Sequence, residues 1–454
     1  MNQKQATLEL GTKPVGRLLW QYALPAVIAM LASSAYNIID RIFIGQIVGP
    51  EAIAGLAITF PFMNLLGAFG ACIGVGASTA ISIRLGQKDY ETAGRLFGNN
   101  ASLNVLAGVT LAIIGLLFLD PILRFFGASD VTLPYAHQFM VIILLGNVFT
   151  HLYFGQNAVL RSVGKPRQAM IATLLTVFLN IALDVVFIVW LRWGIQGGAL
   201  ATVLSQFTAL CWQVKLLSKK DEIVHFKRGI YKLHSNLVKQ ILSIGISPFL
   251  MNACSCIIVI FVNKQLVAYG GDMAVGAYGI ANSVATVFIM FVIGMNQGMQ
   301  PIAGYNYGAR HDDRLMRVLN LTIVCATVIM TIGWVIGMFA PRATARLFTT
   351  DATLMSDSVV AIRYVMFCFP IIGFQMVVAS FFQCIGKVKI SIFLSLSRQL
   401  IILLPLLALL PLWYQLDGVW ISMPVSDALA SIMAFVVMVY NVRTWKHPKK
   451  AERE

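Results

Sequence analysis

Residues 34–45 read SAYNIIDRIFIG, and they place a carboxylic acid, Asp40, inside a long apolar stretch near the N-terminus. The surrounding segment, residues 16–46, is long enough to cross a bilayer, because a spanning helix needs about 20 mostly apolar residues. An ionisable side chain at the bilayer centre costs from about 3 to more than 10 kcal/mol, so it marks a candidate functional site. We expect the rest of the chain to form the scaffold that holds this acid.

The composition of the whole chain is that of a polytopic membrane protein. Of its 454 residues, 58% are hydrophobic and only 12% are charged, and the mean hydropathy is +0.79, which soluble domains do not approach. The N-terminus lacks the layout of a signal peptide, so we expect the chain to be kept whole. The sequence predicts an all-α integral membrane protein with twelve transmembrane helices, near residues 16–46, 53–81, 94–119, 133–160, 168–191, 195–216, 238–268, 275–303, 316–340, 358–384, 390–412 and 418–441.

The distribution of charge gives the expected orientation in the membrane. The net charge is +15, but most Lys and Arg residues fall on the termini and the even-numbered connections. The opposite side receives only six cations: Arg41, Arg124, Arg192, Lys264, Arg342 and Arg346. By the positive-inside rule both termini are expected in the cytoplasm of a cell (inner) membrane. The basic balance is then explained by the membrane, and nucleic-acid binding is not expected.

The seven cysteines do not indicate a redox or metal site. All of them fall within apolar segments, and none forms a CxxC motif or a Cys/His cluster. Small apolar packing residues are the interpretation that fits. We therefore expect no disulfide, no bound metal and no cofactor.

The chain contains an internal repeat with an offset of about 222 residues. The offset aligns Asp40-Arg41 with Asn263-Lys264, and Val163-Gly164-Lys165 with Ile385-Gly386-Lys387. Two parallel six-helix halves are therefore expected, with a cleft for substrate between them. The predicted domains are an N-lobe at residues 1–216, a cytoplasmic linker at 217–237, a C-lobe at 238–441 and a cytoplasmic tail at 442–454.

Polar residues from three predicted helices are expected at one depth. Tyr36 precedes Asp40 by four residues, and Asn180 precedes Asp184 by four, so each pair shares a helix face. Counting at about 1.5 Å per residue from the outer ends of their helices places Asp40, Asp184 and Thr202 about 12 to 14 Å below the outer boundary. The sequence therefore predicts one polar pocket in the outer leaflet.

Two carboxylates beside a phenol, an amide and a hydroxyl can share protons or coordinate a hard monovalent cation such as Na⁺. The alternative is structural: the acids are neutralised by Arg41 or Arg192, or lie exposed in a loop. The second half offers an internal comparison, because the counterparts of Tyr36, Asp40, Asn180, Asp184 and Thr202 are Val259, Asn263, Ile402, Leu406 and Met423. This asymmetry favours a functional role for the first-half pocket.

Two further groups of residues are candidates for moving or binding parts. Pro25 removes a backbone donor from the first helix and is a candidate hinge, with a static kink as the alternative. Uncharged polar residues within the helices are candidates for the substrate cleft, or else for helix–helix hydrogen bonds: Gln297, Gln300, Gln375, Asn282 and Asn157.

Several of these motifs together resemble the multidrug and toxic compound extrusion (MATE) transporters. The resemblance rests on the early Leu-Pro, the Asp40 segment, Gly74-x-Gly76 followed by Arg84-Leu85-Gly86-Gln87, the Val163-Gly164-Lys165 loop, and Asn180 with Asp184. It covers nearly the whole chain, and the pocket resembles that of the DinF-like branch. The NorM-like branch instead has acids in the seventh and tenth helices, which have none here.

The resemblance implies a function and assigns roles to the pocket. It implies a cation-coupled antiporter, driven by H⁺ or Na⁺, that exports amphiphilic and often cationic organic compounds by alternating access, as in antibiotic resistance. Tyr36, Asp40, Asn180, Asp184 and Thr202 would then form the cation-coupling site, with Pro25 as the hinge. The implied partners are small-molecule substrates and the lipid bilayer, and a monomer is expected.

Three other functions stay open from the sequence. A lipid-linked oligosaccharide or peptidoglycan-precursor flippase would use intramembrane cations, for which Arg363 and Arg398 are candidates. A membrane-embedded transferase would need an acidic metal-binding pair or a His-acid motif, and none is present at helical spacing, so an enzyme is not expected. A gated channel would differ by flux that no ion gradient can drive uphill.

Overall fold

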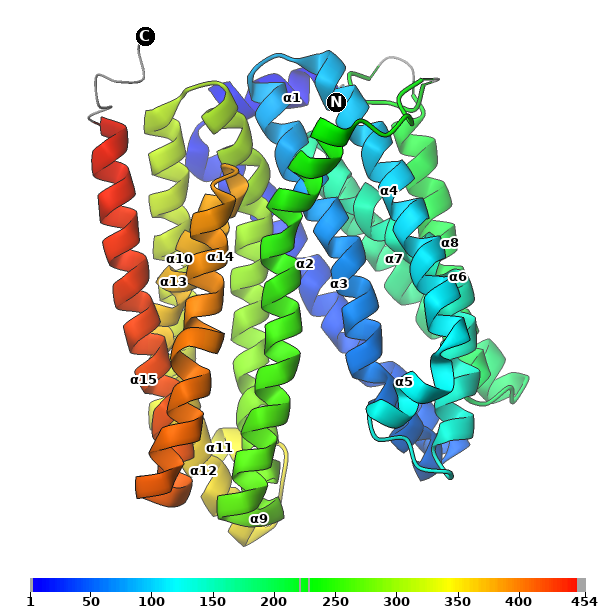
Figure 1. The fold of residues 1–454 in the computed structure, drawn as a ribbon, viewed down its shortest axis with the longest axis vertical. Coiled ribbons are helices and arrows are strands. Elements are labelled where there is room, and N and C mark those ends of the chain that lie inside the picture. The colour runs from blue at the N-terminus through cyan, green and yellow to red at the C-terminus, as the bar shows by residue number, and fades with distance from the viewer. Residues whose placement is uncertain (1–2, 220–221, 228, 447–454) are drawn as a thin grey trace. The chain divides into compact units, whose positions relative to one another are not determined.

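The computed structural model describes residues 3–219, 222–227 and 229–446, and its regular structure in those ranges is helical throughout (Figure 1). The tail predicted at 442–454 lies outside the described residues from position 447 onward. The elements in order are α1 (Gln3–Thr12), α2 (Val15–Phe43), η1 (Ile44–Val48), α3 (Pro50–Gly86), α4 (Tyr90–Leu117), α5 (Leu119–Phe125), α6 (Leu133–Ser162), α7 (Pro166–Asp184), η2 (Val185–Trp190), α8 (Ile195–Leu217), α9 (Ser235–Gly308), α10 (Asp312–Phe339), α11 (Pro341–Arg346), α12 (Ala352–Met366), α13 (Phe369–Cys384), α14 (Val388–Leu396), η3 (Ser397–Leu403) and α15 (Leu404–Lys446). The three η elements are π-helical turns.

The helices of the described ranges account for twelve membrane passes. Nine continuous helical stretches are long and apolar enough to span, and the bent pair α12 and α13 together makes a tenth. Two of the nine contain a non-helical residue that divides them, Gly271 within α9 and Gln415 within α15. Counting each of these two as a pair of spans gives the twelve that the sequence predicts.

The internal repeat is visible in the backbone. Shifting α4 by 222 residues gives the bounds of α10, and the same shift carries the start of α7 onto the start of α14. Positive φ values recur in pairs at the same offset, 61° at Lys88 with 57° at Arg310, and 86° at Gly164 with 75° at Gly386. The predicted repeat is therefore confirmed in the helix bounds and in the turns between helices.

The helices form two compact units. The first contains the described residues up to Asn252, with Gln297–Val318 and Cys384–Gly386. The second contains Ala253–Asn296, Leu319–Gln383 and the described residues from Lys387 onward. The lobe boundaries predicted at residues 216 and 238 stay a prediction.

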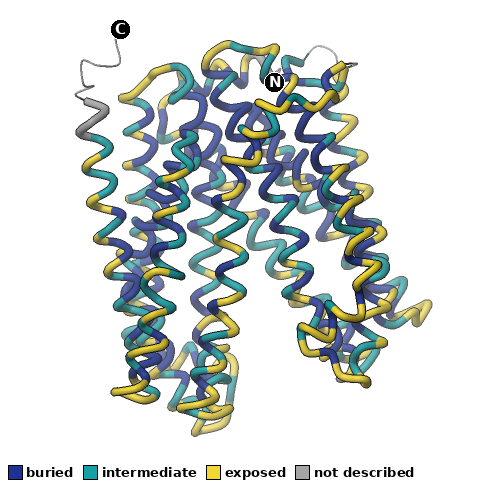
Figure 2. Tube along the Cα trace, viewed as in Figure 1, coloured by how far each residue is buried: buried dark blue, intermediate teal, exposed yellow. Residues whose placement is uncertain are grey.

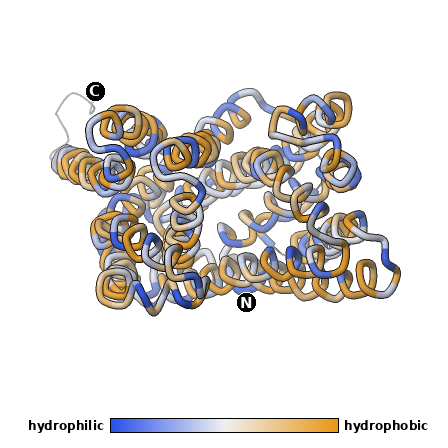
Figure 3. Tube along the Cα trace, turned by 90° about the horizontal axis from the view of Figure 1, so that it is seen from below, coloured by the Kyte–Doolittle hydropathy of each residue, from blue (hydrophilic) through white to orange (hydrophobic). Residues whose placement is uncertain are grey.

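Most helical turns are hydrophobic, and many large apolar side chains are exposed along them (Figures 2 and 3). Leu117 and Trp190 are examples, at 72% and 74% exposed. In water such surfaces would cost free energy, whereas lipid tails are as apolar as the side chains. The exposed faces are therefore those of a membrane protein.

The linker between the halves is packed onto α4. The Phe226 ring lies 4.5 Å from the Phe97 ring. Asn99 donates to the Lys232 carbonyl at 3.1 Å and accepts from the His234 backbone N–H at 3.0 Å. The described residues of the linker are thus fixed to the first unit by both apolar contacts and hydrogen bonds.

Within the first unit, α3 and the start of α9 approach at backbone distance. A Cβ added at Gly76 would overlap the carbonyl oxygen of Ile241, and one added at Gly245 would overlap that of Cys72. Only glycine permits this contact, which is the small-residue packing expected between membrane helices. By contrast, a Cβ at Gly67 on the same α3 would meet no atom within 4 Å.

We predict that Gly76→Ala lowers the stability of the protein by about 1–3 kcal/mol, because the added methyl group forces two backbones apart. Gly67→Ala is the matched control and should be neutral or stabilising by up to about 1 kcal/mol, since alanine is the better helix former. Thermal unfolding of the detergent-purified proteins measures both. Equal midpoints for the two variants would contradict the close α3–α9 contact.

Candidate functional site

Three helices of the first unit bring the predicted pocket together. Asp40 lies near the end of α2, and a Cβ added at Gly198 of α8 would sit 3.3 Å from its Oδ1. On α8, Thr202 donates its hydroxyl to the Gly198 carbonyl at 3.0 Å. Asn180 of α7 lies within hydrogen-bond distance of the Thr202 hydroxyl, at 3.3 Å. Side chains from α2, α7 and α8 therefore meet, as the depth count predicts.

Asn180 joins Asp184 to α8. The two groups that surround its amide fix its orientation. With its nitrogen towards Asp184, it donates to Asp184 Oδ2 at 3.2 Å, and its oxygen accepts from the Thr202 backbone N–H at 3.2 Å. Asn180 is 1% exposed and Asp184 is fully buried. The Asn180 amide thus links the Asp184 carboxylate to the backbone of α8.

The two carboxylates have unused hydrogen-bonding capacity. Among the described residues, Asp40 Oδ1 and Asp184 Oδ1 are both buried and have no hydrogen-bond partner. The carboxylates are also within electrostatic range of each other, and Tyr36 is within range of both. Two buried negative charges that repel each other are unfavourable unless a proton or a cation compensates them. The oxygen atoms of the pocket suit either a proton or a hard monovalent cation.

The neutralisation alternative is not what the geometry shows. Neither Asp40 nor Asp184 forms an ion pair within the ranges that the structure describes. The Arg41 guanidinium instead stacks over the Phe60 ring, 5.1 Å from its centroid, a favourable cation–π arrangement. Arg192 is exposed beyond the end of η2. Neither acid is therefore neutralised by an ion pair among the described residues.

Both acids lie next to π-helical turns, which the sequence analysis did not foresee. The turn η2 begins at Val185, directly after Asp184, and η1 begins at Ile44, four residues after Asp40. Such turns rearrange the backbone hydrogen bonds of a helix and are frequent at functional sites. No residue type marks them in the sequence.

The candidate cleft residues occupy different environments. Gln300 donates to Ser78 and Thr79 of α3, at 2.8 Å each, so it joins α9 to α3. Asn157 donates to the Ala169 carbonyl at 3.0 Å and accepts from Arg161. Gln375 donates to the Leu394 carbonyl at 3.2 Å. These three serve helix–helix hydrogen bonds here, which was the alternative that the sequence left open.

The remaining candidates are more accessible. Gln297 is half-buried, and its amide lies 3.6 Å from the Met30 sulfur. Asn282 is exposed on α9. The hinge candidate Pro25 is buried inside α2, which runs as one helix from Val15 to Phe43. Whether these residues contact substrate or move stays a prediction.

The second unit contains an acid that the sequence analysis missed. Asp427 is 5% exposed and accepts from Arg398 Nε at 2.6 Å. The rule that singled out Asp40, an acid within an apolar span, also applies to Asp427 and could have found it. Because Asp427 neutralises Arg398, one of the two cations that would support a flippase is already paired, and the other, Arg363, is exposed.

The apolar helices define a polytopic membrane protein, and the carboxylates of Asp40 and Asp184 lie close together in its first unit. The model of the MatE family matches residues 25–186 and 244–409. The chain therefore belongs to the MatE family, whose members are transporters rather than enzymes, as the sequence predicts.

Known relatives cover almost the whole chain. The multidrug export protein MepA of Staphylococcus haemolyticus is 27% identical over 427 residues, which is 94% of each chain. A solved structure of the outward-facing conformation of a multidrug resistance MATE family transporter of the MOP superfamily has a TM-score of 0.90 at 26% identity, covering 96% of this chain and 98% of that one. A MATE in the bent conformation has a TM-score of 0.91 at 26% identity, with 97% and 98% covered. The predicted MATE fold is confirmed.

We predict that Asn180→Leu destabilises the protein by about 1–3 kcal/mol, because Asp184 Oδ2 and the Thr202 N–H each lose a buried partner. Asn252→Leu is the control: this exposed amide donates only to the Pro248 carbonyl of its own helix, at 2.8 Å. Thermal unfolding in detergent compares the two. A larger loss for Asn252→Leu would show that Asn180 does not support the pocket.

We predict that Asp427→Ala costs a few kcal/mol of stability, because it leaves the Arg398 charge without its partner. The double variant Arg398→Met/Asp427→Ala should recover most of that loss, since no buried charge remains. The same unfolding measurement applies. A double variant as unstable as the single one would mean that the pair acts through packing rather than charge.

Proposed function

We propose that this protein is a cation-coupled multidrug efflux antiporter whose coupling site is formed by Asp40 and Asp184, with Tyr36, Asn180 and Thr202. The observation that carries the proposal is that the carboxylates of α2 and α7 each keep a buried oxygen without a hydrogen-bond partner, and that neither forms an ion pair among the described residues. Membership of the MatE family and the likeness to MepA support export of small organic compounds as the transport reaction.

The coupling ion that we propose is the proton. The polar groups of Asn180 and Thr202 already form hydrogen bonds with each other, with Asp184 and with the Gly198 carbonyl. Asp40 Oδ1 and Asp184 Oδ1 then remain as buried oxygens without a hydrogen-bond partner among the described residues. This is enough to share one proton, whereas a hard metal cation prefers a larger shell of oxygen ligands. Sodium is the alternative, and transport measurements distinguish the two ions.

The proposed mechanism uses the difference in charge between two states of the pocket. A proton that binds from outside removes the repulsion between the acids, so α2 can pack more closely against α7 and α8. Because Pro25 interrupts the hydrogen bonding of α2, a shift at Asp40 can change the curvature of that helix. A preference of a few kcal/mol for one state is sufficient to couple the ion to the expulsion of substrate. A MATE has been solved in a straight and in a bent conformation, which supports two conformations in a relative.

We also place the protein in the DinF-like branch, with both termini cytoplasmic in the cell membrane and with a monomer as the working unit. The branch proposal rests on the acids of the first half and on Asn263, which stands where the repeat would put the second copy of Asp40. The orientation rests on the excess of cations at the termini and the even-numbered connections.

We predict that Asp40→Asn and Asp184→Asn each reduce gradient-driven dye efflux from proteoliposomes by about tenfold or more, because each removes a charge on which coupling depends. Proton and sodium gradients are imposed separately, and we expect only the proton gradient to drive efflux. Asp130→Asn is the control, because this acid is 89% exposed and pairs only with Arg124. Uphill efflux that survives both pocket substitutions would overturn the coupling site, and efflux driven by sodium alone would name the other ion.

A further inference from the structure

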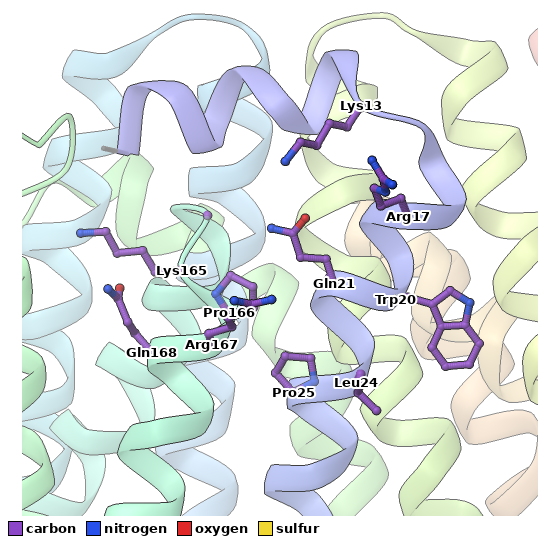
Figure 4. A pocket seen from close by; sticks show the side chains of 11 residues that line it. Lys13, Arg17, Trp20, Gln21, Leu24, Pro25, Lys165, Pro166, Arg167 and Gln168 are labelled. Atoms are coloured by element: carbon purple, nitrogen blue, oxygen red, sulfur yellow. The ribbon is translucent and has the colours of Figure 1, made fainter. Parts of the chain in front are cut away.

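A second cavity lies in the first unit, far along α2 from the acid pair. Its volume is about 640 Å³, and it opens between the start of α2 and the start of α7, with α1 above it (Figure 4). Asp40 is not among its lining residues, and Pro25 is the one lining residue that the proposed coupling mechanism uses. The lining residues are Lys13, Arg17, Trp20, Gln21, Leu24, Pro25, Gly164, Lys165, Pro166, Arg167 and Gln168.

The charge of this cavity is of one sign. Lys13, Arg17, Lys165 and Arg167 line it, and the lining contains no acid. Lys13 pairs with Glu9 and Lys165 with Glu222, at 2.7 Å each. Arg17 and Arg167 form no ion pair within the described ranges of the chain. Two guanidinium groups are therefore available for an anion.

The cavity is amphipathic as well as basic. Trp20 and Leu24 belong to its wall and are 55% and 52% exposed. They lie one and two helical turns below Arg17 on α2, so the apolar wall runs from the cationic end into the membrane-spanning part of the helix. Tryptophan is enriched at this level of membrane proteins, where the head groups meet the hydrocarbon.

The backbone around the cations is held in place. Arg314 Nη2 donates to the carbonyls of Leu10 and Lys13, at 3.1 and 2.6 Å, and Asn306 donates to Leu10 at 3.1 Å. On the other side, a Cβ at Gly164 would lie 2.6 Å from the Ala6 methyl group, so α1 rests directly on the loop before α7. A site fixed in this way loses less conformational entropy on binding.

We propose that this cavity binds the phosphate-bearing head of an anionic glycerophospholipid, with its acyl chains along Trp20 and Leu24. Arginine forms paired hydrogen bonds with phosphate oxygens, and two arginines without acidic partners face the cavity. A cationic drug would be repelled by the two unpaired arginines, which argues against this cavity as the site of the exported compounds. The apolar wall favours a lipid over a free phosphate ion.

The site has a structural consequence for α2. Pro25 lines the cavity, and its ring leaves the Gln21 carbonyl without its usual helical donor. A head group bound beside Gln21 and Pro25 therefore lies next to a turn of α2 that lacks one backbone hydrogen bond. Lipid binding should shift the balance between the shapes of this helix by its difference in affinity for them.

The test compares lipid binding to the delipidated full-length protein by native mass spectrometry. Phosphatidylglycerol and phosphatidylcholine with identical acyl chains are titrated separately, and we expect the anionic lipid to bind about tenfold more tightly. Arg17→Gln/Arg167→Gln should lose that preference. The control Lys215→Gln/Arg317→Gln removes two cations outside the cavity and should keep it. Equal affinity for the two lipids, or equal loss in both double variants, would overturn the proposal.

Two further arms identify the source of the anion. Trp20→Ala leaves every charge in place and should still weaken phosphatidylglycerol binding. This variant also tests the site if the arginine variants do not fold. Inorganic phosphate at millimolar concentration should not displace the lipid. Displacement by phosphate together with unchanged binding in Trp20→Ala would assign the cavity to a soluble anion instead.

The measurement is independent of the proposed transport function, because it uses neither a gradient nor a drug. Asp40→Asn should keep the preference for phosphatidylglycerol over phosphatidylcholine, because the cations of the cavity are unchanged. Loss of efflux in that variant with normal lipid binding, and loss of lipid preference in the arginine variant, would establish two separate sites. Loss of lipid preference in Asp40→Asn would contradict the independence of the cavity.

Discussion

The burial of two like charges without a counter-charge is the constraint on which the first unit depends. Inside a bilayer every polar group needs a partner within the protein, and most of those described here have one. Asp40 and Asp184 depart from this pattern at one oxygen each. Asn180 compensates Asp184 in part, because its amide donates to the other carboxylate oxygen at 3.2 Å. An ion that compensates the charge and then leaves is the simplest reason for a protein to maintain such an arrangement.

The two halves share a backbone but not a chemistry. The offset of 222 residues reproduces helix bounds and turn conformations, yet the second half has Asn263 in place of Asp40. Its own buried acid, Asp427, is paired with Arg398. An acid with a fixed partner is a structural element, whereas an acid without one can change its protonation. The repeated fold therefore allows the two halves to differ in the polar residues that they hold inside their helices.

The fold was largely predictable from the sequence because the bilayer permits few alternatives. Twelve apolar segments, the repeat and the depth count together predicted the helices and placed Asp40, Asp184 and Thr202 at one level. The π-helical turns after Asp40 and Asp184 were not predictable, since backbone hydrogen-bond shifts leave no mark in residue type. The partners of Asn157 and Gln375 also depend on side-chain geometry across helices, which spacing along one helix does not contain. Asp427 is different, because its signal was present in the sequence.

The packing of the linker on α4 bears on how the chain is assembled. Phe226 and Lys232 contact Phe97 and Asn99, so these contacts can form once residue 234 has been synthesised. Segments made first generally fold first during synthesis. The surface of α4 that would otherwise stay exposed is then covered before α9 leaves the ribosome. The linker can thus cover this surface of α4 before the second half is complete, and it remains there as part of the folded protein.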